Sequence, residues 1–434
     1  MVNWMGLEDS LERSDGSCGF LCWVVGIFRG EGQRVVAPRE SLTVTGSMTI
    51  VARLRSAAAH ARWHAPLNRA VLSLEGADSR KLLQGLVTAD VATLDAGPLY
   101  AAFLSAQGRL LFDAFLVSGP SGSVLIDIDQ GAAEGLAKHL KRYKLRSKAA
   151  VRDATSEFQV LAAAGGAGSS DGGDGISNGE GDDCDGGDGG LRVAPCEGGA
   201  WVDPRLPGSL GRRILHRRDA PAPAWLLESG SVEVGAELHA FQLDVLGVPC
   251  GARHLQPFDA LPLEANLELL NAVSFAKGCY LGQELTTRTR FRGVVRKRLI
   301  PVVDARLLQL ADSEAAALGQ AMPALAHLPD VERSLAVRLL SDDGGQQYPW
   351  RSTSSDSAQP HAADSGLRDA RGGKAATMRS YDPSLGLGLA LCRLEALMAG
   401  EPLVAPSDDP PPLAPLRPSW WPEEIARFEA VDDH

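Results

Sequence analysis

The sequence lacks a long apolar run, a cysteine framework and an excess of basic residues. Its longest apolar run near the N-terminus, residues 19–28, has about half of the roughly 20 residues that a membrane-spanning helix needs. The seven cysteines are scattered and include no CxxC pair, which favours a reducing compartment and argues against structural disulfides. The net charge of −11 argues against a generic nucleic-acid binder. We therefore expect a folded multidomain protein with no membrane span and no nucleic-acid partner.

Acidic residues are also absent from residues 48–74, where arginines punctuate an alanine-rich stretch. This composition is typical of an organelle transit peptide, although an ordinary basic first helix would look similar. Six acidic residues precede Met48, which does not suit a transit peptide, and a translation start at Met48 removes this conflict. We therefore assign residues 1–68 to an N-terminal extension that contains a transit peptide starting from Met48.

Hydrophobic periodicity predicts a core of mixed α and β structure after this extension. Residues 69–74 read as a strand and residues 76–91 as a helix. Two more strands are expected on either side of a turn at residues 106–108. The remaining predicted elements are helices at residues 131–146 and 235–248 and strands at residues 123–129, 299–303 and within 377–397.

Two polar segments interrupt this core. Residues 164–190 hold twelve glycines among many acids, so they cannot bury a core and are predicted to be a disordered insertion. Their spacing fits neither a helix–loop–helix calcium loop nor a calcium-binding nonapeptide repeat. Residues 341–376, approximately, form a second polar insertion. The predicted domains are residues 69–300 and a smaller, strand-rich domain at 301–404, followed by a Pro-rich tail at 405–434.

The sequence KGCYLGQE, residues 277–284, sets a single cysteine between two glycines. Gly278 and Gly282 allow backbone conformations with positive φ or a close approach to a ligand. We therefore expect Cys279 and Tyr280 to lie on a tight, exposed loop that presents the thiol. A small buried cysteine beside turn glycines is the alternative.

A thiol on such a loop is suited to nucleophilic attack or to ligation of a soft metal. A neighbouring cation such as Lys277 would lower the pKa of the Cys279 thiol and increase its thiolate fraction. Nucleophilic catalysis would also need a base, and the nearest histidines, His239 and His254, lie in no recognisable motif. An iron–sulfur cluster usually needs four thiolates, so one cysteine could hold a cluster only together with other molecules.

Arginines follow the cysteine motif. Arg288, Arg290 and Arg292 alternate with other residues, so on a strand all three would face one way. No acid occurs between residues 285 and 303, which favours a surface for anions or an acidic partner. A solvated strand face is the alternative. The residues expected to form the anion or partner surface are Arg290, Arg292, Arg296, Lys297 and Arg298.

The stretch LPLEANLELLNAVSFAKGCYLGQELTTRTRFRGVVRKRL, residues 261–299, resembles the signature of the folate-binding YgfZ-type family. Within this family it is most similar to the mitochondrial iron–sulfur assembly factors. The family is itself similar to the aminomethyltransferase (T protein) of the glycine cleavage system. Weaker features, such as FLSAQGRLLFD and DPRLPGSLGRR, extend the resemblance over roughly residues 69–400 without the two insertions.

The resemblance implies an α+β fold, with a pseudo-threefold, ring-like aminomethyltransferase domain that binds tetrahydrofolate in a central channel and a small C-terminal β-barrel. It implies an assembly factor for [4Fe–4S] proteins, working with A-type iron–sulfur carriers on apoprotein targets rather than as a conventional turnover enzyme. The implied cofactors are tetrahydrofolate and a transient, shared iron–sulfur cluster. The implied location is the mitochondrial matrix, with the plastid as the alternative.

The resemblance also implies roles for individual residues. Cys279 is the functional thiol and a shared ligand of the cluster. The residues implied to build its loop are Lys277, Gly278, Tyr280, Gly282, Gln283, Glu284 and Arg288. The residues implied to bind folate are Gly108, Arg109, Asp113, Glu264 and Asn266.

The sequence departs from its relatives at three places. Ala272 replaces a usual glycine, and Cys250 stands where related sequences often have glutamate. Phe112 precedes Asp113 where the aminomethyltransferases place paired aspartates, so one carboxylate is missing and amine-transfer chemistry is in doubt. Two alternatives stay open: a tetrahydrofolate-dependent aminomethyl or one-carbon transferase, and a non-catalytic partner-binding module.

Overall fold

The computed structural model describes residues 50–164, 199–221, 230–309, 322–340, 364–405 and 412–426. The chain divides into two units, Met1–Ser47 and Met48–His434, and all of the described residues belong to the second unit. Residues 165–190 of the expected acidic insertion and residues 341–363 of the expected polar insertion lie outside the described residues. Among the described helices, none has both the length and the apolar character needed to cross a membrane.

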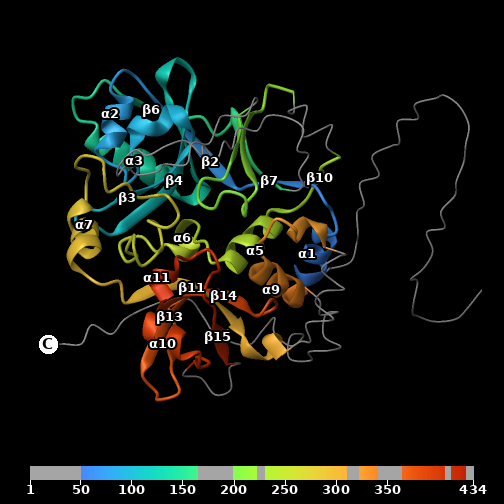
Figure 1. Cartoon of the computed structure of the whole chain (residues 1–434). Helices are drawn as coiled ribbons and strands as arrows, with labels where there is room; N and C mark the ends of the chain where they lie inside the picture. The colour runs from blue at the N-terminus through green and yellow to red at the C-terminus, as the bar shows by residue number, and fades with distance from the viewer. Residues whose placement is uncertain are drawn as a thin grey trace, which may run out of the picture. The chain divides into compact units, whose positions relative to one another are not determined.

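The first sheet is antiparallel and has the strand order β3-β4-β5-β2-β6. Its strands are β2 (Arg69–Glu75), β3 (Leu99–Leu104), β4 (Leu110–Ser118), β5 (Val124–Asp129) and β6 (Ala150–Asp153). Helices α2 (Ser79–Gln84) and α3 (Ala133–Tyr143) pack against this sheet (Figure 1). Leu72 and Leu74 face these helices, while Val71 packs with Phe158 and Trp201 of the second sheet. Burial of both faces explains the nearly unbroken apolar run of β2.

The strands predicted in this region are confirmed, and so is the helix at residues 131–146. The helix predicted over residues 76–91 is wrong in its second half, because only α2 is helical. Val87 instead forms a β-bridge with Phe103, and the Thr88 hydroxyl donates to the backbone carbonyl of Ala272. Contacts with distant segments therefore override the local helical pattern.

The second sheet has the order β10-β1-β7-β9-β8. Its strands are β1 (Trp63–Pro66), β7 (Phe158–Ala164), β8 (Ala200–Val202), β9 (Arg212–Arg217) and β10 (Val232–Glu233). Helices α1 (Ile50–Ala58) and α5 (Ala236–Leu246) share a hydrophobic core with β1. The helix predicted at residues 235–248 is thus confirmed as α5.

The predicted N-terminal boundary at residue 68 is wrong. Val51, Leu54 and Trp63 are almost fully buried in the main core, so residues 50–66 belong to the fold. A transit peptide that starts from Met48 and runs to residue 68 would include these core residues. Residues 1–49 lie outside the described part of the chain.

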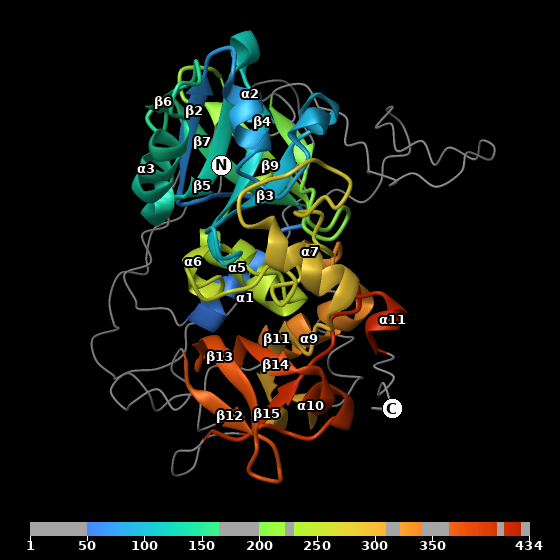
Figure 2. The same ribbon diagram turned by 90° about the vertical axis from the view of Figure 1, so that its left-hand side faces the viewer.

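The third sheet has the order β12-β13-β14-β11-β15 and forms the C-terminal domain together with α10 (Leu394–Ala399) (Figure 2). Its strands are β11 (Lys297–Asp304), β12 (Gly366–Arg368), β13 (Lys374–Asp382), β14 (Leu387–Arg393) and β15 (Leu413–Pro415). The other α-helices in the described part of the chain are α6 (Gly251–His254), α7 (Gln283–Arg292), α9 (Asp330–Leu340) and α11 (Glu423–Ala426).

The strands predicted at residues 299–303 and within 377–397 are confirmed, but two boundaries of this domain are wrong. β12 and the start of β13 lie inside the polar insertion predicted at about 341–376. Beyond residue 404, β15 pairs with β11, and Trp421 is buried in the core of the domain. The Pro-rich composition suggested a tail, but an edge strand such as β15 tolerates proline.

Candidate functional site

The motif loop, residues 277–282, is held by the chain segment that follows α2. The Lys277 ammonium donates three hydrogen bonds of 2.8 Å, and Leu281 N–H donates to the Gly85 carbonyl at 3.0 Å. The three acceptors of Lys277 are the backbone carbonyls of Gln84, Val87 and Ala89. Burial lowers the pKa of Lys277 to about 8. Lys277 therefore anchors the loop, and its three N–H groups are directed at carbonyls rather than at the Cys279 thiol.

Gly282 brings the motif loop into close contact with the turn between β3 and β4. Gly282 and Gly108 both have φ near +79°. A Cβ atom on Gly282 would collide with the Ser105 carbonyl and lie 2.8 Å from the Leu104 Cβ, and a Cβ atom on Gly108 would lie 2.9 Å from the Gly282 carbonyl oxygen. Two glycines from separate sequence motifs are therefore needed at one backbone contact.

Gly278 behaves differently from Gly282, although the sequence suggested the same role for both. Gly278 does not adopt positive φ, and a Cβ atom there would meet no atom within 4 Å. Of the two expected special glycines, only Gly282 has the predicted backbone conformation.

The loop presents Cys279 to solvent, as expected: the cysteine is unpaired and exposed. Next to it, Tyr280 is buried, and burial raises the pKa of this tyrosine to about 12. The Gln283 side chain closes the loop by accepting a hydrogen bond from the Tyr280 N–H at 3.1 Å. Lys277 and Tyr280 thus face inward and Cys279 faces outward, where another molecule could contact the thiol.

The arginines after the loop lie on a helix, so the prediction of a strand is wrong. α7 places Arg288 and Arg292 on one side, four residues apart. Arg290 lies elsewhere, with its guanidinium carbon 5.4 Å from the centre of the Phe275 ring. Alternation of arginines does not specify a strand here, because only Thr289 and Phe291 lie between them and Phe291 is exposed.

Arg298 does not belong to the exposed basic surface predicted for it. It is buried and donates to the Glu268 carboxylate at 2.7 Å and to the Asn266 side chain at 3.0 Å. Asn266 in turn donates to the Leu299 carbonyl of β11 at 2.7 Å. These contacts join the segment before the motif loop to the C-terminal sheet. Arg296 and Lys297 are exposed, as expected.

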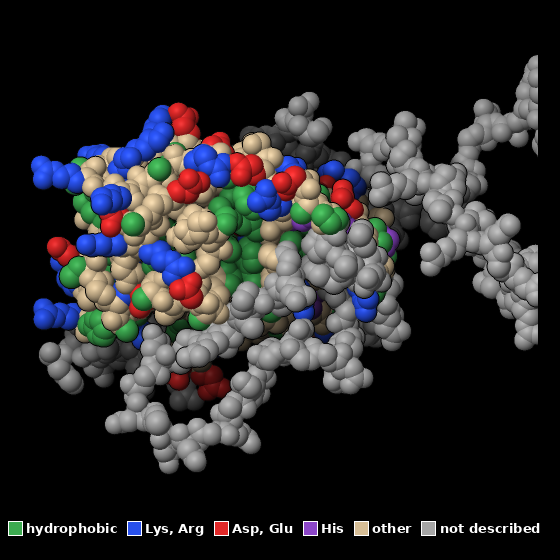
Figure 3. Space-filling view, turned by 90° about the horizontal axis from the view of Figure 1, so that it is seen from above, with side chains coloured by type: hydrophobic (Ala, Val, Ile, Leu, Met, Phe, Trp, Pro, Cys, Tyr) green, Lys and Arg blue, Asp and Glu red, His purple; other side chains and the backbone are tan. Residues whose placement is uncertain are grey.

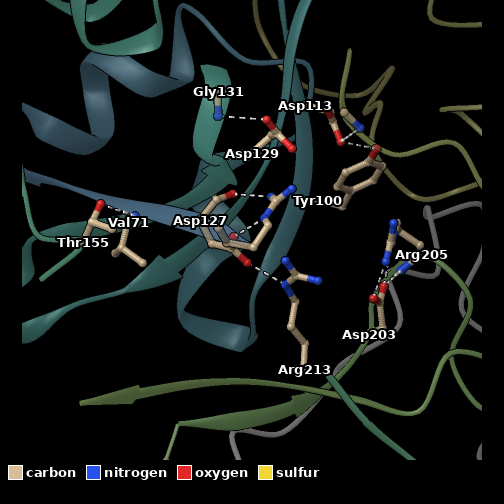
Figure 4. Close-up of polar contacts among 12 residues, drawn as sticks. Val71, Tyr100, Asp113, Asp127, Asp129, Gly131, Thr155, Asp203, Arg205 and Arg213 are labelled. Carbon is tan, nitrogen blue, oxygen red and sulfur yellow. Dashed lines mark hydrogen bonds and ion pairs between the residues drawn. The ribbon is translucent and has the colours of Figure 1, made fainter. Parts of the chain in front are cut away.

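A second polar site, which we call the arginine cluster, is buried between the first two sheets and consists of Arg69, Asp127, Asp203, Arg205 and Arg213. Asp127 accepts from Arg69 at 2.6 Å and from Arg213 at 2.5 Å. Arg205 forms a two-pronged ion pair with Asp203 (Figure 4). Burial alone would raise the pKa of Asp127, but Arg213 and Arg69 outweigh it and lower that pKa.

The three arginines of the cluster surround one aromatic ring. Their guanidinium carbons lie 5.9, 5.0 and 4.1 Å from the centre of the Phe115 ring for Arg69, Arg205 and Arg213. One terminal nitrogen of Arg205 and one of Arg213 are buried without a hydrogen-bond partner. Buried donors of this kind are costly unless a ligand or water satisfies them. The cluster can therefore accept an electron-rich group such as a carboxylate or a ring carbonyl.

Other titratable groups border the arginine cluster. Tyr100 donates to the Asp113 carboxylate at 3.1 Å, and Gly251 N–H lies 3.4 Å from the same oxygen (Figure 4). Burial and the Asp113 carboxylate raise the pKa of the Cys250 thiol. Burial and the nearby arginines lower the pKa of His239 to about 3, so His239 is neutral at physiological pH.

The structure shows where a second aspartate, at position 112 beside Asp113, would lie. Residues 112 and 113 point to opposite faces of β4. Phe112 packs edge-on against Phe103 and against His139 of α3, away from Tyr100. A carboxylate at position 112 would therefore lie against α3 and not in the arginine cluster.

Of the five residues expected to bind folate, the structure places only Asp113 next to the arginine cluster. Gly108 forms the turn that contacts Gly282, and Arg109 donates to the Asp259 carbonyl at 2.6 Å. Glu264 is half-buried, and burial raises its pKa, while Asn266 contacts β11. Those four residues are therefore distributed between the turn and the junction with the C-terminal domain.

Sequence reasoning missed the arginines of the cluster. Asp203, Arg205 and Arg213 all lie in DPRLPGSLGRR, a segment that matched the family without any sign in the sequence that its charges are buried. Within the described part of the chain, no three His, Cys, Asp or Glu side chains are grouped as a metal site.

Comparison with known proteins supports this architecture. Residues 296–423 match the family model of the CAF17 C-terminal beta-barrel domain. The structure is similar to glycine cleavage system aminomethyltransferase T from Bartonella henselae, with a TM-score of 0.54 and 12% identity over 85% of this chain and 88% of that one. At this identity the likeness establishes the fold alone; together with the family-model match it confirms the aminomethyltransferase-like fold with a C-terminal barrel domain.

Curated relatives named as mitochondrial iron–sulfur cluster assembly factor IBA57 homologs occur in several fungi. The protein from Neurospora crassa is 34% identical over 54% of this chain and 52% of its own length. The protein from Phaeosphaeria nodorum is 33% identical over 64% of each chain, and that from Coccidioides immitis is 32% identical over 76% of this chain and 71% of its own. The match thus spans about half to 71% of these relatives, and the chain belongs to the family of the mitochondrial IBA57 iron–sulfur cluster assembly factors.

Proposed function

We propose that this protein is a mitochondrial iron–sulfur cluster assembly factor that uses the Cys279 thiol to help mature [4Fe–4S] proteins. The relatives carry this function and this location in their names. The role of the thiol is supported by its exposure to solvent. Cys279 is exposed, while its neighbours Lys277 and Tyr280 anchor the loop beneath it. A loop built in this way offers sulfur to another molecule without rearranging the core.

The proposal includes a complex in which Cys279 and another protein hold the cluster together. An iron–sulfur cluster is usually held by four thiolates, and Cys279 supplies one. The remaining ligands would come from an A-type carrier or from the apoprotein target that receives the cluster. The cluster is thus cargo that passes through a transient complex.

Rescue of cells that lack the endogenous factor tests the role of Cys279. We expect Cys279→Ser to lose most of the activity of mitochondrial [4Fe–4S] enzymes that the unaltered protein restores, with [2Fe–2S] enzymes as the internal control. Cys392→Ala is the matched cysteine control, because Cys392 is buried in the C-terminal core, and it should rescue. Equal rescue by Cys279→Ser and the unaltered protein, at equal protein levels, would remove the thiol from the mechanism.

Tetrahydrofolate binding at the arginine cluster is the second part of the proposal. The donor set fits this ligand, because Arg205 and Arg213 have unpartnered N–H groups for its carbonyl or carboxylate oxygens. Asp113 could accept hydrogen bonds from the amino groups of the pterin ring. When bound, the folate would supply a carrier for one-carbon units or a reductant, and these side chains would hold and orient it.

A change at Asp113 tests folate binding. Asp113→Asn keeps the size of the side chain and an acceptor for Tyr100, but it removes the charge. We expect tetrahydrofolate affinity, measured by quenching of tryptophan fluorescence, to fall at least about tenfold. Asp129→Asn is the control, because Asp129 caps a turn by accepting from Gly131 N–H at 3.0 Å. Unchanged affinity in Asp113→Asn would place the folate elsewhere.

A further inference from the structure

One side of α7, and the segment just after it, carry cations that form no ion pair within the described part of the chain. Arg288, Arg292 and Arg296 are exposed, and among the described residues none of them has an ion-pair partner. The helix faces the viewer in Figure 2. Charges of one sign that stay unpaired on a surface favour an oppositely charged partner.

Several cations elsewhere on the described surface are paired with acids. Arg80 pairs with Asp95, Arg152 with Glu75 and Glu157, and Lys138 with Glu134. On the face seen from above, both acidic and basic side chains are visible (Figure 3). α7 and the segment after it have no acid between residues 285 and 303, so their charge is opposite in sign to the net charge of −11 of the whole chain.

Apolar side chains are exposed among these arginines. Phe291 is 66% exposed and Val294 is 52% exposed. Phe291 touches Phe275 edge-on, with the ring centres 5.9 Å apart, so its ring is held in a defined orientation. Beside it lies a surface hollow of about 460 Å³ lined by Gln283, Glu284, Thr287, Arg288, Phe291 and Arg292. An oriented aromatic ring flanked by arginines is the composition found at the energetic centres of protein interfaces.

We propose that the α7 face, defined as Arg288, Phe291 and Arg292, docks an acidic segment of the protein partner that meets Cys279. The inference rests on the proposed function for the identity of that partner as an A-type carrier. Phe291 would pack against an apolar side chain of the partner, and the two arginines would pair with its carboxylates. Gln283 links this face to the thiol, because it lines the hollow and also closes the motif loop.

The position of Glu284, the single acid on this side of α7, predicts how the partner is oriented along the helix. Glu284 lies in the first turn, next to the motif loop, and Arg288 and Arg292 follow one and two turns later on the same side. An acidic segment would avoid Glu284 and pair with the C-terminal half of the helix. Cys279 precedes the N-terminal end of α7. The part of the partner that reaches the thiol would therefore lie beyond this end of α7, and its acidic segment would lie along the C-terminal half of the helix.

Binding to a purified A-type carrier, measured by calorimetry at low and moderate salt, tests this inference. We expect Arg288→Glu with Arg292→Glu to weaken binding at least about tenfold and to reduce its salt dependence. Phe291→Ser should weaken binding at both salt concentrations. The matched control is Lys141→Glu with Arg142→Glu, a double charge reversal on exposed residues of α3, which should bind normally.

The outcomes separate this inference from the proposed function. If the carrier binds and the α7 variants bind as well as the control, the docking face is wrong while the proposed function stands. If the carrier does not bind the unaltered protein, the inference fails together with the assignment of its partner. Failure of the α7 variants to rescue [4Fe–4S] enzymes, with tetrahydrofolate binding intact, would support docking over a general loss of structure.

Discussion

Asp127→Ala should lower the free energy of unfolding by about 3–5 kcal/mol, the range expected when one partner of a buried ion pair is removed. Asp127 is fully buried and is the carboxylate that both Arg69 and Arg213 contact. Its removal leaves two guanidinium groups without a counter-charge in a region that water does not reach. Urea denaturation followed by circular dichroism would measure the loss, which should appear as a lower midpoint with little change in slope.

An exposed pair provides the control for this experiment. Asp95 accepts two hydrogen bonds from Arg80 at 2.6 and 2.5 Å, so its geometry is as good as that of the buried pair. Asp95 is 71% exposed, however, and water can replace the lost carboxylate. Asp95→Ala should therefore change stability little. Similar losses in both variants would mean that burial does not govern the strength of the arginine cluster.

Gly282→Ala should disrupt the motif loop and reduce rescue of [4Fe–4S] enzymes, while Gly278→Ala should be tolerated. A side chain at position 282 would force an unfavourable φ of +79° and collide with the Ser105 carbonyl. Backbone strain and overpacking each cost about 1–3 kcal/mol, so we expect a loss of about 2–6 kcal/mol. Thermal unfolding would measure stability, and limited proteolysis would report whether the loop has opened.

The two glycine variants flank the same cysteine and differ only in backbone environment. Since a methyl group at position 278 would meet no atom within 4 Å, the alanine variant should keep Cys279 exposed and active. Loss of activity in Gly278→Ala at normal stability would show that the open space at Gly278 is itself used by a partner. Normal stability and activity in Gly282→Ala would contradict the described contact between the motif loop and the turn at Gly108.

Local periodicity was sufficient for elements that bury a regular pattern of side chains. The strands β2 to β5 were predicted from short apolar runs next to turn residues, and α3 from the helical spacing of Leu136 and Leu140. α7 was not predicted, because its outer side is polar and shows no such repeat. The end of α2 was missed for another reason: Val87 and Thr88 leave the helical pattern to bond with Phe103 and Ala272.

The amino-acid sequence was enough to predict the exposed thiol, the family and the two-domain plan, because the KGCYLGQE motif is contiguous and its glycines lie within a few residues of Cys279. Which of those glycines is constrained depends on the folded chain, since Gly282 is restricted by the distant Ser105 and Gly108. The arginine cluster depends on it too, because Arg69, Asp127 and Arg213 come from three separate strands. Ionic contacts between residues so far apart follow no local period, so only the packing of the sheets against each other brings these charges together.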